Sequence, residues 1–289
     1  MVHVYFDTSG LNQLLDDPSR EVLVEALTKH ASVRISAINI VEALKTASSA
    51  RRTALLTLMN TLTGGASPMD FPNTIVRGVY RTFARRFRWR KPMLIVNRDP
   101  DGDDLQRMLL DPTAISDEDL VLAAEVTANR EATFDQMVFD GREDFQELLA
   151  QFPRLRLTAS DTMRSCLRNR ETLIEAWLAR TYRTAVGKEL SREEAEDLLE
   201  EPMLVLYMAA FGYGMHLRSI QRSHYSRGRN AGGMDLAQAV YLRLCDRFVT
   251  HDQSQYRALR FLARFVRHDR PVVQRYRDFK RAIVREAPE

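Results

Sequence analysis

The chain has 289 residues, of which 45% are hydrophobic and 28% are charged, so it can form one large domain or two smaller ones. No run approaches the ~20 apolar residues of a membrane-spanning helix, and the N-terminus lacks a signal-peptide pattern, so we expect a cytoplasmic protein with no membrane partner. The formal net charge is only +3, but arginine supplies nearly all of the positive charge. That preference suits phosphate binding, and a coding bias toward arginine explains it equally well.

The first 50 residues alternate short strands with helices. Apolar runs predict strands over 2–6 and 33–37, and helical patterns follow over 9–15, 19–30 and 39–46. Strands that alternate with helices predict a parallel sheet.

The middle of the chain, residues 51–229, has a different pattern. Apolar residues recur there at helical spacing, for example at Leu55, Leu58, Met59 and Leu62, and again from Leu204 to Phe211. We therefore expect a mainly α-helical insertion over 51–229, which interrupts a discontinuous α/β core made of residues 1–50 and 230–289.

The last segment returns to α/β character. Asp235 is expected to open an apolar helix over 236–244, and a strand is expected over 247–250. A basic helical tail is expected from there to Arg285.

Four carboxylates occupy matching positions in this pattern. Asp7 and Asp252 follow predicted strands, Glu42 lies early in a helix after a strand, and Asp235 precedes the last strand. The carboxyl ends of parallel strands meet at one edge of a sheet, where ligands bind. Acids that converge there repel one another unless a cation neutralises them, and Mg²⁺ or Mn²⁺ prefers such oxygen ligands. Taken singly, each acid is equally well explained as a solvated residue or, for Asp235, as a helix N-cap.

Three segments, 4–9, 35–42 and 235–252, resemble the PIN-domain nucleases. The resemblance implies a three-layer α/β/α sandwich with a central, mostly parallel sheet. It also implies an Mg²⁺- or Mn²⁺-dependent endoribonuclease, with RNA favoured over single-stranded DNA as the substrate. An antitoxin or other protein partner and a homodimer are further features of such proteins. The residues that match the family's catalytic and metal-binding acids are Asp7, Glu42, Asp235 and Asp252, and the supporting polar residues are Ser9 and Thr250.

The chain departs from that family in two ways. Compact PIN toxins have no counterpart of the 51–229 block. Some members carry a further acid after the last one, where this chain has Gln253, Ser254 and Gln255. The four matched acids are all present, so metal binding is still expected.

Two arginine clusters are candidate nucleic-acid contacts. In the first, basic residues alternate with aromatic residues, which suits a path for a single strand, although a solvated helix face gives the same pattern. The second cluster precedes Asp235. The residues proposed to contact nucleic acid are Arg85, Arg86, Arg88, Arg222, Arg227 and Arg229.

Two other functions compete with the ribonuclease. A non-catalytic nucleic-acid-binding or scaffold protein could use the same fold, but a decayed site is expected to lose acids. A haloacid-dehalogenase-type phosphatase also begins with an Asp at a strand end. That family needs a second Asp two positions later, where this chain has Ser9, so we set it aside.

Overall fold

The computed structural model describes residues 1–85, 100–126, 128–129, 158–168, 178–217, 231–265 and 272–286. Its centre is a parallel four-stranded sheet with the order β2-β1-β3-β4. The strands are β1 (Val2–Phe6), β2 (Ala31–Arg34), β3 (Arg247–Thr250) and β4 (Val272–Arg275). The predicted α/β class and parallel sheet are confirmed.

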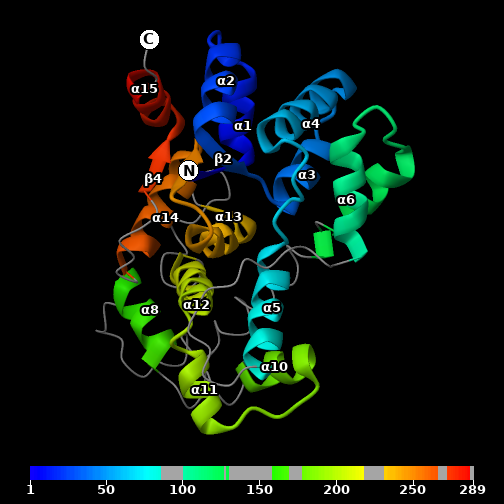
Figure 1. The fold of residues 1–289 in the computed structure, drawn as a ribbon. Coiled ribbons are helices and arrows are strands. Elements are labelled where there is room, and N and C mark those ends of the chain that lie inside the picture. Colours follow the sequence, from blue (N-terminus) through cyan, green and yellow to red (C-terminus); the bar gives the residue numbers. More distant parts are fainter. Residues whose placement is uncertain are drawn as a thin grey trace.

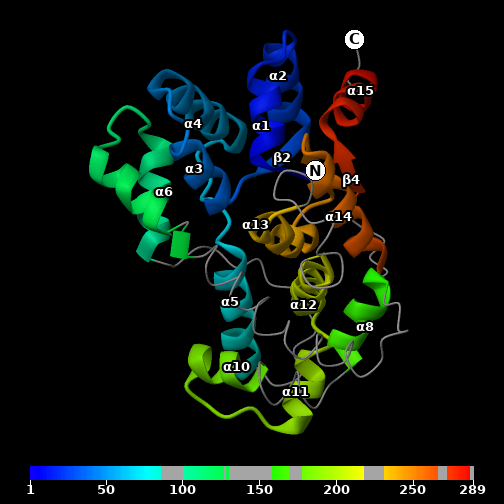
Figure 2. The ribbon, with the colours of Figure 1, turned by 180° about the vertical axis from the view of Figure 1, so that it is seen from behind.

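Helices cover both faces of the sheet, an arrangement consistent with three layers (Figures 1 and 2). One face carries α1 (Thr8–Leu15), α2 (Arg20–His30) and α15 (Tyr276–Glu286). The other carries α13 (Gly233–Ala237), the 3₁₀ helix η3 (Gln238–Arg243) and α14 (Gln253–Phe265). Opposite faces are what right-handed crossovers require, because β1 connects to β2 on one side and β3 to β4 on the other.

The remaining helices are α3 (Ala37–Leu44), α4 (Ser49–Thr63), α5 (Pro72–Arg85), α6 (Pro100–Leu110), α8 (Ala159–Arg168), α10 (Ala179–Val186), α11 (Arg192–Leu198) and α12 (Pro202–Met215). Of these, α3 and α4 lie beside α1 and the β2 edge of the sheet, and the others lie farther from it (Figure 1). The helices expected around Leu55 and Leu204 are confirmed as α4 and α12. No helix within the described ranges is both long and apolar enough to cross a membrane.

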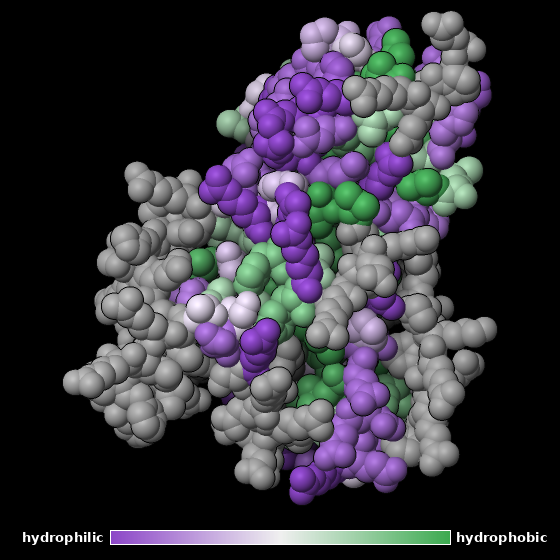
Figure 3. All heavy atoms as spheres, turned by 90° about the vertical axis from the view of Figure 1, so that its left-hand side faces the viewer, coloured by the Kyte–Doolittle hydropathy of each residue, from purple (hydrophilic) through white to green (hydrophobic). Residues whose placement is uncertain are grey.

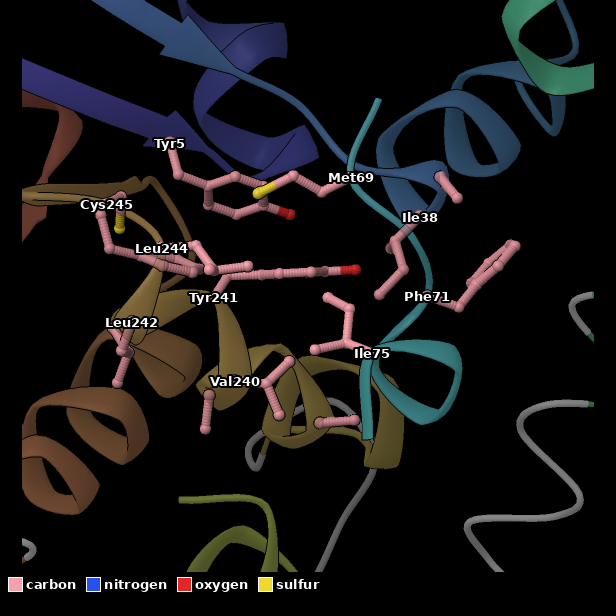
Figure 4. Close-up of a cluster of buried hydrophobic side chains, with 14 of the residues drawn as sticks. Tyr5, Ile38, Met69, Phe71, Ile75, Val240, Tyr241, Leu242, Leu244 and Cys245 are labelled. Carbon is pink, nitrogen blue, oxygen red and sulfur yellow. The ribbon is translucent and has the colours of Figure 1, made fainter. Parts of the chain in front are cut away.

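A buried cluster joins the sheet to these helices (Figure 4). The rings of Tyr5 on β1 and Tyr241 on η3 lie 4.9 Å apart, and the Tyr241 hydroxyl donates to the Asp70 carbonyl at 2.7 Å. Met69, which precedes α5, and Ile75, in the first turn of α5, lie on the other side of the cluster (Figure 4). Apolar contact therefore runs from the sheet into α5 without a break. The division into a core and an insertion stays a prediction.

Three sequence-based boundaries are wrong. The second strand spans Ala31–Arg34 and not 33–37, because Ser36 and Asn39 form a capping box that starts α3 at Ala37. The expected 236–244 helix is a short α-helix followed by η3. The basic tail is not wholly helical, because Val272–Arg275 pairs with β3 as an edge strand. Two β-branched residues, Val272 and Val273, favour that strand.

Candidate functional site

The order of the strands places a topological switch point between the carboxyl ends of β1 and β3. The chain leaves β1 toward β2 and leaves β3 toward β4, so the crossovers diverge between these two central strands. Open parallel sheets bind ligands at such a point. Asp7 follows β1 directly, and Thr250 is the last residue of β3. Two of the expected site residues therefore lie at the switch point of the sheet.

Asp7 is buried, with 5% of its surface exposed, and it caps the N-terminus of α1. Its Oδ1 accepts the Gly10 amide at 2.7 Å, and its Oδ2 accepts hydroxyl hydrogen bonds from Ser9 at 2.8 Å and Thr250 at 3.0 Å. Both predicted supporting residues therefore contact Asp7. The hydroxyls of Ser9 and Thr250 fix the orientation of its carboxylate.

The environment of Asp7 disfavours its charged form. Burial raises the pKa of Asp7 to about 7, although the hydrogen bonds from Gly10, Ser9 and Thr250 act in the opposite direction. The negative charge of Asp235 raises the pKa further. A buried carboxylate poised near neutral pH is a common feature of functional sites.

Ser9 links the first strand to the loop after β3. Its hydroxyl accepts the backbone amides of His251 at 2.8 Å and Asp252 at 2.9 Å while donating to Asp7. The Ser9 oxygen therefore binds residues that are 242 and 243 positions away in the chain. This arrangement fixes the β3–α14 turn against the start of α1.

Glu42 lies on α3 and is partly exposed. Burial raises its pKa to about 7, with further increases from the charges of Asp235 and Asp7, while a hydrogen bond from Thr8 and the charge of Lys45 lower it. The charge of Asp235 therefore acts on both Glu42 and Asp7, and the charge of Asp7 acts on Glu42.

Asp235 does not open its helix, which corrects the expected N-cap. The cap is Gly232, and Asp235 is the third residue of α13. Its carboxylate accepts the Gly232 amide at 2.8 Å, as the acid of a capping box does. The expected helix begins at residue 236, but α13 begins at Gly233, so Asp235 lies within its first turn.

Asp252 lies at the same edge of the sheet, but its side chain caps the next helix. Its Oδ1 accepts the Ser254 amide at 2.7 Å, the Ser254 hydroxyl at 2.6 Å and the Gln255 amide at 2.8 Å. These are the bonds of an N-cap on α14. The side chain is exposed.

The donor set fits a hard divalent cation in its chemistry. Three carboxylates and nearby hydroxyls offer only oxygen ligands, which Mg²⁺ and Mn²⁺ prefer. Throughout the part of the chain that is described, no three His, Cys, Asp or Glu side chains lie close enough together to hold one ion. Gathering of these acids around a shared ion therefore stays a prediction.

Three residues of the site were not identified from the sequence. Thr8 contacts Glu42, and the Asn39 amide donates to the Phe6 carbonyl at 3.1 Å and to the Thr8 hydroxyl at 3.2 Å. Gly10 lets α1 approach the sheet, because an added Cβ would lie 3.0 Å from the Val249 carbonyl oxygen and 3.1 Å from the Asp7 Oδ1. The Ser36–Asn39 capping pattern was the available signal for Asn39.

The predicted arginine contacts are mostly outside the described residues. Arg86, Arg88, Arg222, Arg227 and Arg229 belong to ranges that the structure does not describe. Arg85 is exposed at the end of α5, on the half of that helix that packs against α10 through Tyr80 and Tyr182. Its role in nucleic-acid binding stays a prediction.

Comparison of the chain with protein-family models, with curated proteins and with solved structures found no match in any of the three.

Proposed function

We propose that this chain is a PIN-like, Mg²⁺- or Mn²⁺-dependent ribonuclease. One observation carries the proposal: Asp7 lies buried at the topological switch point of a parallel sheet with its pKa raised to about 7, and Glu42, whose pKa is also raised to about 7, is influenced by the charges of Asp235 and Asp7. Desolvated carboxylates that influence one another are costly to ionise without a neutralising cation. RNA as the substrate, and an antitoxin or a second copy as the partner, follow from the resemblance to PIN nucleases.

The residues of the chain have distinct parts in this proposal. Asp7, Glu42 and Asp235 would hold the ion, which when bound activates water and stabilises negative charge on a phosphodiester. Ser9 and Thr250 orient the Asp7 carboxylate, and Thr8 orients Glu42. Such supporting hydrogen bonds keep metal ligands in position and adjust their basicity.

The test is cleavage of a defined RNA by the purified full-length protein with Mn²⁺. Asp7→Asn is expected to lower the rate by about 100-fold or more, and excess EDTA is expected to abolish cleavage by the wild type. The matched control is Asp16→Asn, which makes the same change at the exposed C-cap of α1, where Asp16 pairs with Arg51 at 2.7 Å. This control should retain wild-type activity within about twofold.

The proposal is overturned if Asp7→Asn cleaves as fast as the wild type while both have the same circular dichroism spectrum. That result would assign any cleavage to a contaminant or to another site. Mapping of the cut ends identifies the bond that is broken.

A non-catalytic nucleic-acid-binding protein is the second candidate, and the state of Asp252 favours it. Within the described residues, the three hydrogen bonds that its carboxylate accepts all use Oδ1 and come from the first turn of α14, and, unlike the capping acid Asp7, Asp252 is exposed to solvent. Equal RNA affinity in EDTA and in Mn²⁺, with no product from any RNA, would support this candidate. An affinity that rises with Mn²⁺ and depends on Asp7 would support the nuclease.

A further inference from the structure

An open cleft of about 530 Å³ lies beside the carboxylate site, between the end of α1 and the exposed side of α15. His251, Asp17 and the α15 residues Arg277, Lys280 and Arg281 line it. Figures 1 and 2 both show α15 next to α2 at the same end of the molecule. In Figure 3, which looks onto the side that carries α15, hydrophilic side chains gather over the upper part of the surface.

The cleft has a surplus of positive charge. Among the described residues that line it, α15 contributes three cations and Asp17 is the one carboxylate. That carboxylate, Asp17, is already satisfied, because its Oδ1 accepts the Lys280 ammonium at 2.6 Å and its Oδ2 accepts the Tyr276 hydroxyl at 2.9 Å. In the described part of the chain, Asp17 pairs with neither Arg277 nor Arg281, and the ion pair of Arg277 is with Asp278.

Both guanidinium groups face solvent. The Arg277 side chain is 63% exposed and lies 3.6 Å from Asp278, whose carboxylate is nearer to Arg275 at 3.0 Å. Arg281 is also exposed. Residues four positions apart lie on one side of a helix, separated by ~6 Å along its axis. That separation is similar to the distance between successive phosphates of an extended strand, and arginine binds phosphate through two parallel hydrogen bonds.

The cleft and the carboxylate site share one wall. His251 lines the cleft, and its backbone amide donates to the Ser9 hydroxyl, which in turn donates to Asp7. A strand with one phosphate at the carboxylates could therefore continue past His251 toward α15. The acidic site and the basic cleft are complementary, because the first requires a cation and the second attracts the polyanion that would be cleaved.

We propose that this cleft binds the phosphodiester backbone of a single nucleic-acid strand, next to the bond that is cleaved, through Arg277 and Arg281. The position next to the cleaved bond rests on the proposed nuclease function. Binding itself does not, because the cleft contains no ligand of the ion. The two ideas can therefore fail separately.

The experiment measures binding of a fluorescent 12-nucleotide RNA to the full-length protein by anisotropy, in EDTA so that no cleavage occurs. Arg277→Glu and Arg281→Glu are each expected to weaken binding about fivefold or more and to lower the slope of log affinity against log salt by about 1. Arg192→Glu is the matched control. The Arg192 side chain is 85% exposed, and α11 lies at the opposite end of the molecule from α15 (Figure 1). The RNA affinity of this variant should stay within about twofold of the wild type.

Other ligands distinguish the sources of phosphate. DNA of the same sequence should bind through the same two arginines, whereas uridine monophosphate should compete only at far higher concentration. The inference is overturned if both charge reversals bind as the wild type does, if Arg192→Glu weakens binding equally, or if the mononucleotide competes as well as the 12-mer. If a charge-reversal variant fails to fold, the neutral variants Arg277→Gln and Arg281→Gln replace it in the same measurement. If the wild type binds RNA through these arginines but cleaves no RNA in Mn²⁺, the proposed nuclease activity is rejected and the proposed strand binding in the cleft is supported.

Discussion

Two buried aspartates lie at opposite ends of α1 and behave in opposite ways. Asp7 precedes the helix and is 5% exposed, and Asp17 follows it and is 9% exposed. Burial raises the pKa of Asp7 to about 7. At Asp17 burial also acts to raise the pKa, but hydrogen bonds from Lys280, Ser19 and Tyr276 outweigh it, and the pKa is lowered.

The difference teaches that the partners of a buried acid, together with its desolvation, decide its role. Asp17 has an ammonium group 2.6 Å away, so it is an ionised cross-link between the end of α1 and α15. Asp7 has two hydroxyls and an amide as partners and other acids as neighbours. Proteins commonly tolerate such a costly arrangement where it serves function. A bound divalent cation would supply at Asp7 what Lys280 supplies at Asp17.

The largest expected effect is on the pH dependence of stability. Asp7 has a folded-state pKa of about 7, above the unfolded value of about 4. The folded state therefore binds more protons between these values, and the free energy of unfolding falls as the pH rises toward 7 and beyond. Asp7→Asn does not lose stability in this way. The free energy of unfolding of the variant minus that of the wild type should therefore increase by about 2–3 kcal/mol between pH 5 and pH 8.5. Urea unfolding in EDTA at both pH values measures this change.

Asp17→Asn is the matched control for that experiment. Because the pKa of Asp17 is lowered, this residue stays ionised across the same window. Its replacement should destabilise the protein by a similar amount, about 2 kcal/mol, at both pH values. The lowered pKa values of His3 and His216, due mainly to burial, act in the opposite direction near pH 6 but cancel in differences from the wild type. Parallel pH profiles for Asp7→Asn and Asp17→Asn would contradict the comparison.

Removal of the cation should convert Asp17 into a residue like Asp7. Lys280→Met leaves Asp17 with the Tyr276 hydroxyl and the Ser19 amide. We expect a loss of about 1–3 kcal/mol at pH 8 that becomes smaller at pH 5, because the Asp17 pKa rises once the ammonium is gone. Lys29→Met, in the last turn of α2, is the control and should change stability by less than about 0.5 kcal/mol. An equal loss at both pH values would mean that Lys280 acts only through packing.

The position of Asp7 at a strand end could be predicted from the sequence, whereas the pairing of Asp17 with Lys280 could not. Asp7 could be predicted because local signals sufficed: an apolar strand, then an acid, then a helix start. The parallel sheet and the strand over Arg247–Thr250 were also visible locally and are confirmed. The Asp17–Lys280 pair joins residues 263 positions apart, and no local pattern marks either member.

Other features depended on tertiary contact. Thr8 bonds Glu42, and Asn39 bonds Phe6 and Thr8, only because the end of β1 and α3 meet at one edge of the sheet. The strand β4 has four residues within an arginine-rich stretch, so its pairing with β3 decides its structure more than its composition does. Asp252 matched a motif by spacing, yet the hydrogen bonds that it accepts from the first turn of α14 show a capping role that spacing alone could not reveal.

A smaller effect is expected where the backbone near Asp7 is changed without altering a charge. In Gly10→Ala the new Cβ would lie 3.0 Å from the Val249 carbonyl oxygen, so α1 must shift and carry the Asp7 carboxylate with it. We expect a loss of about 1–2 kcal/mol in the free energy of unfolding and about a tenfold loss in cleavage rate. Binding of the 12-mer RNA in EDTA should be unchanged, since the basic cleft is not involved. Wild-type stability and cleavage would show that the start of α1 is not tightly packed around Asp7.

The smallest effect should come from a single hydroxyl. Thr8→Val keeps the shape of the side chain and removes the hydrogen bond that lowers the pKa of Glu42. The pKa of Glu42 should then rise, so cleavage that needs the ionised group should reach half its maximum at a pH about 0.5 higher than in the wild type. The loss of stability should be under about 1 kcal/mol, because the Asn39 amide keeps its bond to the Phe6 carbonyl. Thr28→Val on α2, whose hydroxyl bonds only to helix carbonyls, should leave the midpoint of the pH profile unchanged. A role of Thr8 in packing alone would lower the rate equally at every pH, so the shift in midpoint is the result that separates positioning of a site acid from support of the fold.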